Sequence, residues 1–418
     1  MNIPFKTPGR RAVTIAIAFM LGTAYVGLAA TQLLASWFGH RVELASLKRA
    51  AWLDRGNAEY FDNLGRYYDL VARDPTSAVA DYQAAVHLNP HSARYWFDLA
   101  SSYQILGDTA NQTSALEHAI QADATTPDVA WEAANLYLVQ GQNEKALNEF
   151  RVVIANDPPL AGSALQFCWR IQPDVDSLLR YVVPHRADSL SSFLALLESK
   201  QETSGALKVW DALIKTNEPF EQRFVFEFIP YLVQHKEADA AVLAWRQAAA
   251  RFGLTSYLPS SSNLVVNGNF DFKVLDAGFD WQYQKQSSVS LTLDPSDFHA
   301  GRRSLLITFD GPGISDAGIY QLIAVQPNAK YDFTGYYKTG EMEGAGGPHF
   351  TIQDMYTQAV YYESDELKDA GFWKSATGDF TTGADCKLIL LHIRRLPAGS
   401  PMRGKLWVGD FHIVPSPS

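Results

Sequence analysis

Hydrophobic and polar positions follow three different patterns along the chain. The run from Ala12 to Phe38 has no charged side chain for 27 positions. From about residue 50 to residue 252, apolar and alanine positions recur at the three-to-four-residue spacing that predicts amphipathic helices. After residue 263, short segments alternate apolar and polar residues between Gly, Pro and Asp turns, which predicts antiparallel strands. The pattern therefore predicts one apolar helix, an array of helices and a β-sandwich.

The apolar run is long enough for a membrane span, because a helix of about 20 apolar residues crosses a bilayer core. Basic residues precede it, up to Arg11, and such residues tend to stay on the cytoplasmic side. We therefore expect a membrane anchor within residues 1–42 and a body exported to the periplasmic or extracellular side. The alternative is a cleaved secretory signal, because the small residues of Gly27–Ala30 suit a signal peptidase.

A repeat of 34 to 35 residues runs through the helical region. Tyr68, Tyr103 and Tyr137 recur at spacings of 35 and 34 residues, and a small residue lies three positions before each of them. Gly107 and Gly141 are placed to end the first helix of two of the units. A repeated helix pair buries its apolar face only against its neighbours, so this periodicity predicts a stack of helix hairpins.

These residues resemble tetratricopeptide repeats. In YFDNLGRYYDL…AVADYQAAVHLNP, the small residue, the aromatic residue, the alanine-containing second helix and the final proline come in that family's order. Three units are predicted, at about 58–90, 93–124 and 127–158. Degenerate continuations surround Trp210 and Trp245, whereas segment 159–188 contains several prolines and fits no unit. The resemblance implies a curved stack whose groove binds a protein partner.

The region after residue 263 has a second resemblance. It contains, in order, the segments NLVVNGNFD, GFDWQ, GRRSLLITF, GIYQLIAVQPNAKYDFTGYYKTG, FWKSATGDFTTGADCKLILLHI and GKLWVGDFHIV. This order resembles the jelly-roll carbohydrate-binding modules of the family 4 and family 9 type. The resemblance implies two facing antiparallel sheets and a binding function.

Modules of this kind hold sugar rings with aromatic faces and planar polar side chains. The resemblance therefore implies a carbohydrate site, for which the candidates are Trp281, Tyr336, Trp373, Tyr283, Gln353 and Arg394. Core packing is the alternative for each aromatic ring. The resemblance also implies a structural calcium ion held by Asp271 and Asp410. Gly409 stands where a further carboxylate is expected, and Ca²⁺ prefers about six to eight oxygen ligands.

The net charge and the absence of known catalytic motifs exclude several classes of protein. The formal net charge is −10 and no basic stripe is visible, so nucleic acid is not an expected partner. Cys168 and Cys386 are far apart and are expected to be lone thiols. The sequence has no HExxH, GxSxG or phosphate-loop motif, so we expect no catalysis. The alternative is glycoside hydrolysis by acids such as Glu363 and Asp365, because that reaction requires two carboxyl groups across a cleft.

The sequence thus predicts a multidomain chain with four parts. Residues 1–42 form a basic stub and the membrane helix, 43–255 an all-α tetratricopeptide-like solenoid, 256–262 a linker, and 263–418 an all-β jelly-roll sandwich. The expected function is that of a membrane-anchored scaffold. Its repeats dock a protein, and its jelly roll binds a glycan or another envelope component in extracellular polysaccharide production or export. The alternatives are an assembly factor that binds only proteins and, less favoured, a glycoside hydrolase.

Overall fold

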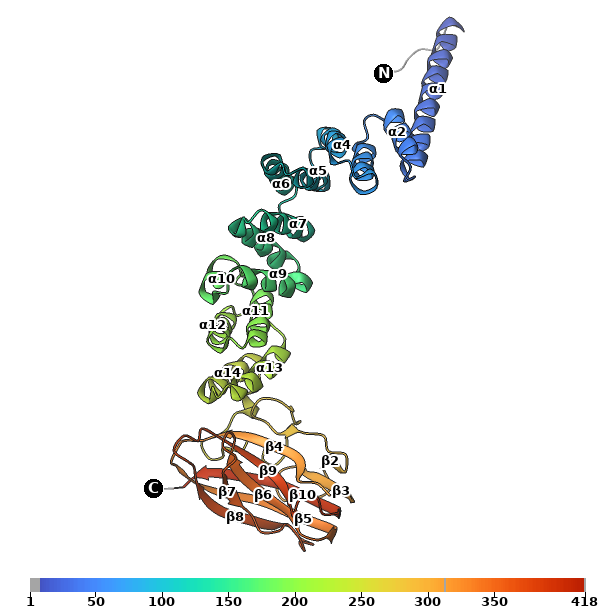
Figure 1. Ribbon diagram of the computed structural model, residues 1–418. Coiled ribbons are helices and arrows are strands. Elements are labelled where there is room, and N and C mark those ends of the chain that lie inside the picture. The colour runs from blue at the N-terminus through green and yellow to red at the C-terminus, as the bar shows by residue number, and fades with distance from the viewer. Residues whose placement is uncertain (1–7, 312, 417–418) are drawn as a thin grey trace. The chain divides into compact units, whose positions relative to one another are not determined.

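The computed structural model describes residues 8–311 and 313–416. By its internal contacts the chain divides into two compact units, Met1–Phe193 and Leu194–Ser418. Helices fill the chain up to about residue 257, and strands follow (Figure 1). The predicted fold class, an apolar N-terminal helix followed by a helical array and a β-sandwich, is confirmed.

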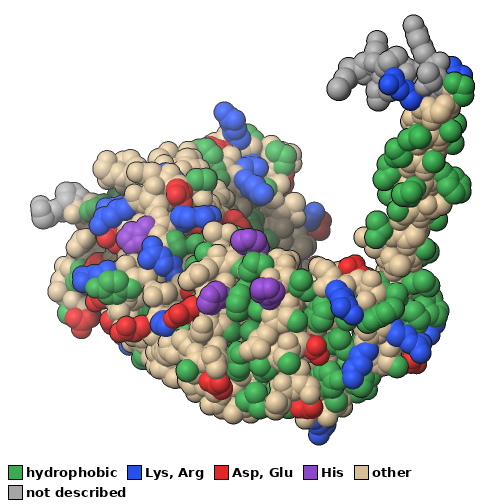
Figure 2. Space-filling view, turned by 90° about the horizontal axis from the view of Figure 1, so that it is seen from above, with side chains coloured by type: hydrophobic (Ala, Val, Ile, Leu, Met, Phe, Trp, Pro, Cys, Tyr) green, Lys and Arg blue, Asp and Glu red, His purple; other side chains and the backbone are tan. Residues whose placement is uncertain are grey.

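The first unit begins with helix α1, Pro8–Gly39. Among the described residues it is the one helix long and apolar enough to cross a membrane. Its apolar side chains are exposed along most of its length, as the green side chains of the projecting helix show in Figure 2. A membrane anchor and a signal sequence both have these properties.

Helix hairpins make up the rest of the first unit. The bounds are α2 Leu44–Leu53, α3 Ala58–Tyr67 with the π-helix η1 Tyr68–Ala72, α4 Pro75–Leu88, α5 Ala93–Leu106, α6 Thr109–Ala122, α7 Pro127–Val139, α8 Asn143–Asn156, α9 Pro158–Ile171, α10 Val175–Tyr181 and α11 Ala187–Lys200, which continues into the second unit. The hairpins α3/α4, α5/α6 and α7/α8 coincide with the three units predicted from the repeat.

The spacing of small residues in the repeat has a packing cause. A Cβ atom added to Gly65 would lie 2.6 Å from the ring of Tyr82, so only glycine lets α3 approach α4 this closely. Ala100 occupies the equivalent position in the next unit and is 0% exposed. Gly107 and Gly141 end α5 and α7 with positive φ angles of 73° and 72°, a backbone region that glycine adopts at little cost.

Segment 159–188, to which the sequence assigned no unit, is helical in large part. Pro158 and Pro159 lie in the first turn of α9. Backbone N–H groups there have no partner within the helix, so the N–H that proline lacks removes no helical hydrogen bond. The side chain of Asp157 caps this turn by accepting the backbone N–H of Leu160 at 3.1 Å. The prolines thus begin a helix here.

The second unit contains three further helices and the sandwich. The helices are α12 Thr203–Lys215, α13 Gln222–Gln234 and α14 Ala238–Phe252, followed by the 3₁₀-helix η2 Thr255–Tyr257. Trp210 of α12 is 4% exposed and Trp245 of α14 is 2% exposed. Trp245 also contacts the sandwich, because a Cβ atom at Gly278 would lie 2.4 Å from its ring. The last helix and the first loops of the sandwich therefore pack directly on one another.

The sandwich has ten strands in two five-stranded antiparallel sheets. The strands are β1 Gln282–Tyr283, β2 Val289–Asp294, β3 Ser304–Gly311, β4 Asp316–Ala324, β5 Lys330–Gly344, β6 Gly347–Asp354, β7 Val360–Glu363, β8 Lys374–Thr381, β9 Leu388–Leu396 and β10 Met402–Pro415. The first sheet has the order β1-β4-β9-β6-β7, and the second has the order β2-β3-β10-β5-β8.

Alternation along each strand separates the core from the two outer faces. In β9, Leu391 and Ile393 belong to the core, so His392 points to the outer face of the first sheet. In β5, Phe333 and Tyr337 point inward, so Tyr336 points to the outer face of the second sheet. The outer faces are therefore the surfaces on which the two sheets offer side chains to a ligand.

Candidate functional site

A row of polar and aromatic side chains crosses the outer face of the first sheet. Direct cross-strand partners connect all five strands, from β1 through β4, β9 and β6 to β7. We name this set the polar row, and its members are Gln282, Tyr320, His392, Thr351 and Glu363. Each member points outward, because its neighbours along the strand point into the core, as Phe350 and Ile352 do beside Thr351.

Two members of the polar row are shielded from solvent although they point to an outer face. Thr351 is 0% exposed and His392 is 7% exposed. Neither Oγ1 of Thr351 nor Nε2 of His392 has a hydrogen-bond partner within the described part of the chain. Buried polar atoms are nearly always paired, so two unpaired atoms on cross-strand partners indicate a site that a ligand or water completes.

Asp316 fixes the orientation of His392. Nδ1 of His392 donates a hydrogen bond to Oδ2 of Asp316 at 2.6 Å, and Oδ1 of Asp316 accepts the backbone N–H of Gly318 at 2.7 Å. A neutral imidazole that donates through Nδ1 has its lone pair on Nε2. His392 therefore offers a hydrogen-bond acceptor next to the hydroxyl of Thr351.

Tyr320 and Gln282 continue the polar row toward β1. The hydroxyl of Tyr320 donates to Oε1 of Gln282 at 3.0 Å. Burial raises the pKa of the Tyr320 phenol, and Asp276 raises it further, so the phenol stays protonated at neutral pH. This end of the row thus presents an aromatic ring beside an amide, the combination that sugar rings require.

Gln353 and Arg394, two residues that the sequence predicts for carbohydrate binding, lie on the same outer face. Arg394 is the cross-strand partner of His349 and of Asp316, and Gln353 is the partner of Leu390. Neither the Gln353 amide nor the Arg394 guanidinium has a hydrogen bond or an ion pair with another described side chain. Both are free to contact a ligand at the edge of the polar row.

The sequence did not single out Tyr320, His392 and Thr351. A local signal was present for His392, because it interrupts an apolar run in the segment LILLHIRR. A polar residue at an alternate position of an apolar strand faces away from the core. That signal does not show which residues of the other four strands lie beside it.

Tyr336 and Trp373, two further predicted residues, both lie beside His299 at the outer face of the second sheet. The ring of His299 stacks on Tyr336 with centroids 3.6 Å apart, and its centroid lies 6.0 Å from that of Trp373. The indole N–H of Trp373 donates to Asp297 at 3.0 Å, and Lys338 pairs with the same carboxylate at 2.5 Å. The loop between β2 and β3 thus holds these rings in one cluster.

Trp407 of β10 extends this aromatic cluster. Its indole N–H donates to Asp294 at 2.8 Å, and the ammonium of Lys338 lies 5.7 Å from the ring centroid. We name as the aromatic cluster the residues His299, Tyr336, Trp373 and Trp407. Phe372, next to Trp373, is 86% exposed, which leaves a large apolar side chain open to a ligand.

Trp281 and Tyr283 lie elsewhere. Trp281 is 1% exposed, and its indole N–H donates to the backbone carbonyl of Asn267 at 3.1 Å. Its ring packs against Phe270 and Phe411 in the core, so neither ring face is open to a sugar. Tyr283 packs partly against the core, and burial raises its pKa to about 12. The six predicted residues therefore occupy two outer faces and the interior.

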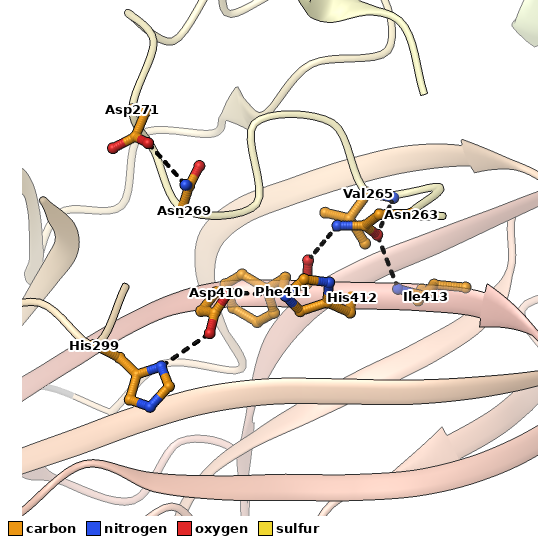
Figure 3. Close-up of polar contacts among 9 residues, drawn as sticks. All are labelled: Asn263, Val265, Asn269, Asp271, His299, Asp410, Phe411, His412 and Ile413. Atoms are coloured by element: carbon orange, nitrogen blue, oxygen red, sulfur yellow. Dashed lines mark hydrogen bonds and ion pairs between the residues drawn. The ribbon is translucent and has the colours of Figure 1, made fainter. Parts of the chain in front are cut away.

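Asp271 and Asp410, the predicted calcium ligands, do not converge on one point (Figure 3). The two oxygens of Asp271 accept hydrogen bonds from the amide of Asn269 at 2.8 Å and the backbone N–H of Arg302 at 2.7 Å. Those of Asp410 accept from His299 at 2.9 Å and His412 at 2.8 Å.

No group of three or more His, Cys, Asp or Glu side chains within residues 8–311 and 313–416 is placed to hold a metal. The oxygens of Asp271 and Asp410 already accept hydrogen bonds, so these two side chains do not offer Ca²⁺ the unpaired carboxylate oxygens that it prefers. Calcium binding stays an untested prediction.

The C-terminal region is similar to known protein domains. Residues 262–394 match the family model CBM_4_9, described as a carbohydrate binding domain. A solved CBM4 structure is similar over 36% of this chain and 99% of its own length, at 16% identity and a TM-score of 0.28. The CBM22-1 xylan-binding domain of Xyn10C from Paenibacillus barcinonensis is similar over 36% of this chain and 93% of its own, at 16% identity and a TM-score of 0.26.

A solved structure of MamA protein is similar over 43% of this chain and 93% of its own, at 18% identity and a TM-score of 0.29. No curated protein matches the chain. The family match confirms the carbohydrate-binding resemblance that the sequence predicts for the sandwich. The helix hairpins agree with the predicted repeat region.

Proposed function

We propose that the chain is a membrane-anchored binding scaffold, whose sandwich holds a glycan on the polar row and whose helical repeats dock a protein partner. In this proposal α1 stays in the membrane, and the two units lie on its periplasmic or extracellular side. The scaffold then takes part in producing or exporting extracellular polysaccharide.

One observation supports the glycan site above the others. A line of side chains that donate and accept hydrogen bonds crosses five strands on an outer face, and two of its buried polar atoms have no partner in the described chain. Such atoms need a partner, either a ligand or water, because a buried unpaired polar group lowers stability. The family match of residues 262–394 agrees with carbohydrate as the ligand.

The aromatic cluster is the second candidate surface for a glycan. The observation in its favour is Phe372, which is 86% exposed beside Trp373. Every indole N–H of the cluster is already bonded to a carboxylate, so its rings are held rigid and offer only their faces and edges. Such a platform stacks sugar rings without selecting among their hydroxyl groups.

Affinity gel electrophoresis tests the proposal and separates the two surfaces. The full chain in detergent micelles is run in gels that contain xylan, mannan, a β-1,3-glucan or alginate. We expect retardation by at least one polymer, abolished by Tyr320→Ala and kept by the matched aromatic change Trp373→Ala. The opposite pattern would move the site to the aromatic cluster. Mobility unchanged in all four gels would refute glycan binding and favour an assembly factor that binds proteins alone.

Three further measurements test the remaining parts. A reporter enzyme fused after residue 45 should be active only outside the cytoplasm, and the mature chain should keep its full mass of 46.4 kDa; a smaller mature chain would show a cleaved signal. Reducing sugar released from a bound polymer, and lost on Glu363→Gln, would instead support the hydrolase alternative.

A further inference from the structure

We propose that Thr351 and His392 are the specificity-determining pair of the polar row and bind two neighbouring free hydroxyl groups of one sugar ring. This inference rests on the proposed function, because it names what the polar row recognises. It assigns the ligand to a class: polysaccharides whose rings keep two adjacent hydroxyl groups unsubstituted.

The hydrogen-bonding capacity of the two side chains fits a pair of hydroxyl groups. In the neutral imidazole, Nε2 of His392 is an acceptor, because Nδ1 donates to Asp316. It therefore needs an O–H donor from the ligand. Oγ1 of Thr351 both donates and accepts, so it can pair with a second hydroxyl whichever way that group is turned.

The register places the two side chains close enough for one ring. His392 and Thr351 are direct cross-strand partners on β9 and β6. The Cβ atoms of such partners are about 4.5–5.5 Å apart on the same side of a sheet. Side chains at this separation contact neighbouring substituents of a single sugar.

Access to the pair depends on the side chains around it. Oγ1 of Thr351 and Nε2 of His392 are shielded in the ligand-free chain. Gln353 and Arg394 project from the same strands on the same face, and neither side chain is fixed by another described side chain. Both can change rotamer without losing a hydrogen bond, so they are able to line the edge of a ligand that reaches the pair.

The two buried polar atoms lower the stability of the chain unless a ligand or water pairs with them. Removing a buried hydroxyl that has no partner, by a change to an apolar group of the same shape, is neutral or stabilising. Thr351→Val makes such a change, because valine replaces the hydroxyl by a methyl group. If the hydroxyl of Thr351 had a structural hydrogen-bond partner, the same change would remove that bond and lower the stability.

The test measures binding and melting temperature on the same variants of the full chain in detergent micelles. Thr351→Val removes the hydroxyl, Thr351→Ser restores it, and both are compared with the unaltered chain. The probes are xylan, mannan and alginate, whose rings keep two adjacent free hydroxyl groups, and a β-1,3-glucan, whose linkage leaves no such pair and which should bind weakly. Each is used unmodified and O-acetylated and is measured by calorimetric titration.

We expect Thr351→Val to weaken binding about tenfold or more, which is the loss of one hydrogen bond to a ligand. Thr351→Ser should bind within about threefold of the unaltered chain, and the melting temperature of Thr351→Val should equal or exceed the original. O-acetylation should weaken binding to the unaltered chain and have little further effect on Thr351→Val.

Three results would overturn the inference. Equal binding by the unaltered chain and Thr351→Val would show that the pair does not select the ligand, while glycan binding itself would stand. A melting temperature lowered by several degrees in Thr351→Val would show a structural partner for the hydroxyl. Binding of none of the eight probes by the unaltered chain would refute both this inference and the proposed function.

Discussion

Replacing Asp62 by asparagine should remove a loss of folding stability that the first helical repeat suffers as the pH rises. The side chain of Asp62 in α3 is 0% exposed, and Arg94 of α5 pairs with its Oδ2 at 2.9 Å. Oδ1 of Asp62 and Oδ2 of Asp98 are buried without a hydrogen-bond partner in the described chain. Asp98 lies within hydrogen-bonding reach of Asp62, so one proton held between the two carboxyl groups satisfies both.

The size of this pH-dependent loss of folding stability follows from the pKa of Asp62. Burial raises this pKa from 3.8 to about 7; Asp98 raises it as well, whereas Arg94 and Arg66 lower it. The folded repeat therefore keeps the proton up to about pH 7, whereas the unfolded chain loses it near pH 3.8. The stability that this proton provides is complete below pH 3.8 and is lost as the pH rises to about 7.

The full loss is about 4 kcal/mol, and roughly 2 kcal/mol of it falls between about pH 5.5 and pH 7. In Asp62→Asn, a neutral amide donates to Asp98 at every pH, so this loss disappears. The other charged or titratable groups that face the pair stay in place, and they are Arg66, Asp69, Tyr82, Tyr95 and Glu132.

Hydrogen exchange read by mass spectrometry checks this prediction on peptides from α3 and α5. Between about pH 5.5 and pH 8, after correction for intrinsic exchange, protection in the unaltered chain should fall roughly thirtyfold, the equivalent of about 2 kcal/mol. Asp62→Asn should show no such fall. The control is Glu59→Gln, an exposed neighbour on the same helix, which should behave like the unaltered chain. An unchanged fall in Asp62→Asn would refute the reasoning.

Three further predictions concern packing, a buried hydroxyl and the calcium candidates. Gly65→Val forces a side chain into the ring of Tyr82 and should cost about 1–3 kcal/mol in urea unfolding followed by helical circular dichroism; an unchanged midpoint would contradict the packing account. Thr382→Val removes a hydroxyl that donates to a backbone carbonyl at 2.6 Å and should destabilise by about 1–3 kcal/mol, in contrast to the change at Thr351. Because Asp271 and Asp410 already accept N–H donors, adding Ca²⁺ or a chelator should move the melting temperature by less than about 1 °C; a larger, saturable rise with Ca²⁺ would show a bound ion.

The sequence determined the succession of elements, because each element depends on interactions between residues close together in the chain. Gly107 and Gly141 end helices through their own backbone freedom, and the small residue at position 65 in the repeat predicts a close helix contact without reference to distant residues. Alternation within β5 and β9 likewise separates inward from outward side chains. Periodicity of this kind is local, so it can be recognised in the sequence alone.

Only the tertiary structure determines which residues come together in the candidate site. Gln282 and His392 are 110 positions apart in the sequence, and only the pairing of β1, β4 and β9 brings them into one row. Trp281 is next to a strand of two residues, too short for alternation to set its direction, and packing against Phe411 draws it into the core. A sequence pattern shows which side chains share a face of their own strand, but register and long-range packing decide which strands lie side by side and which polar atoms remain unpaired.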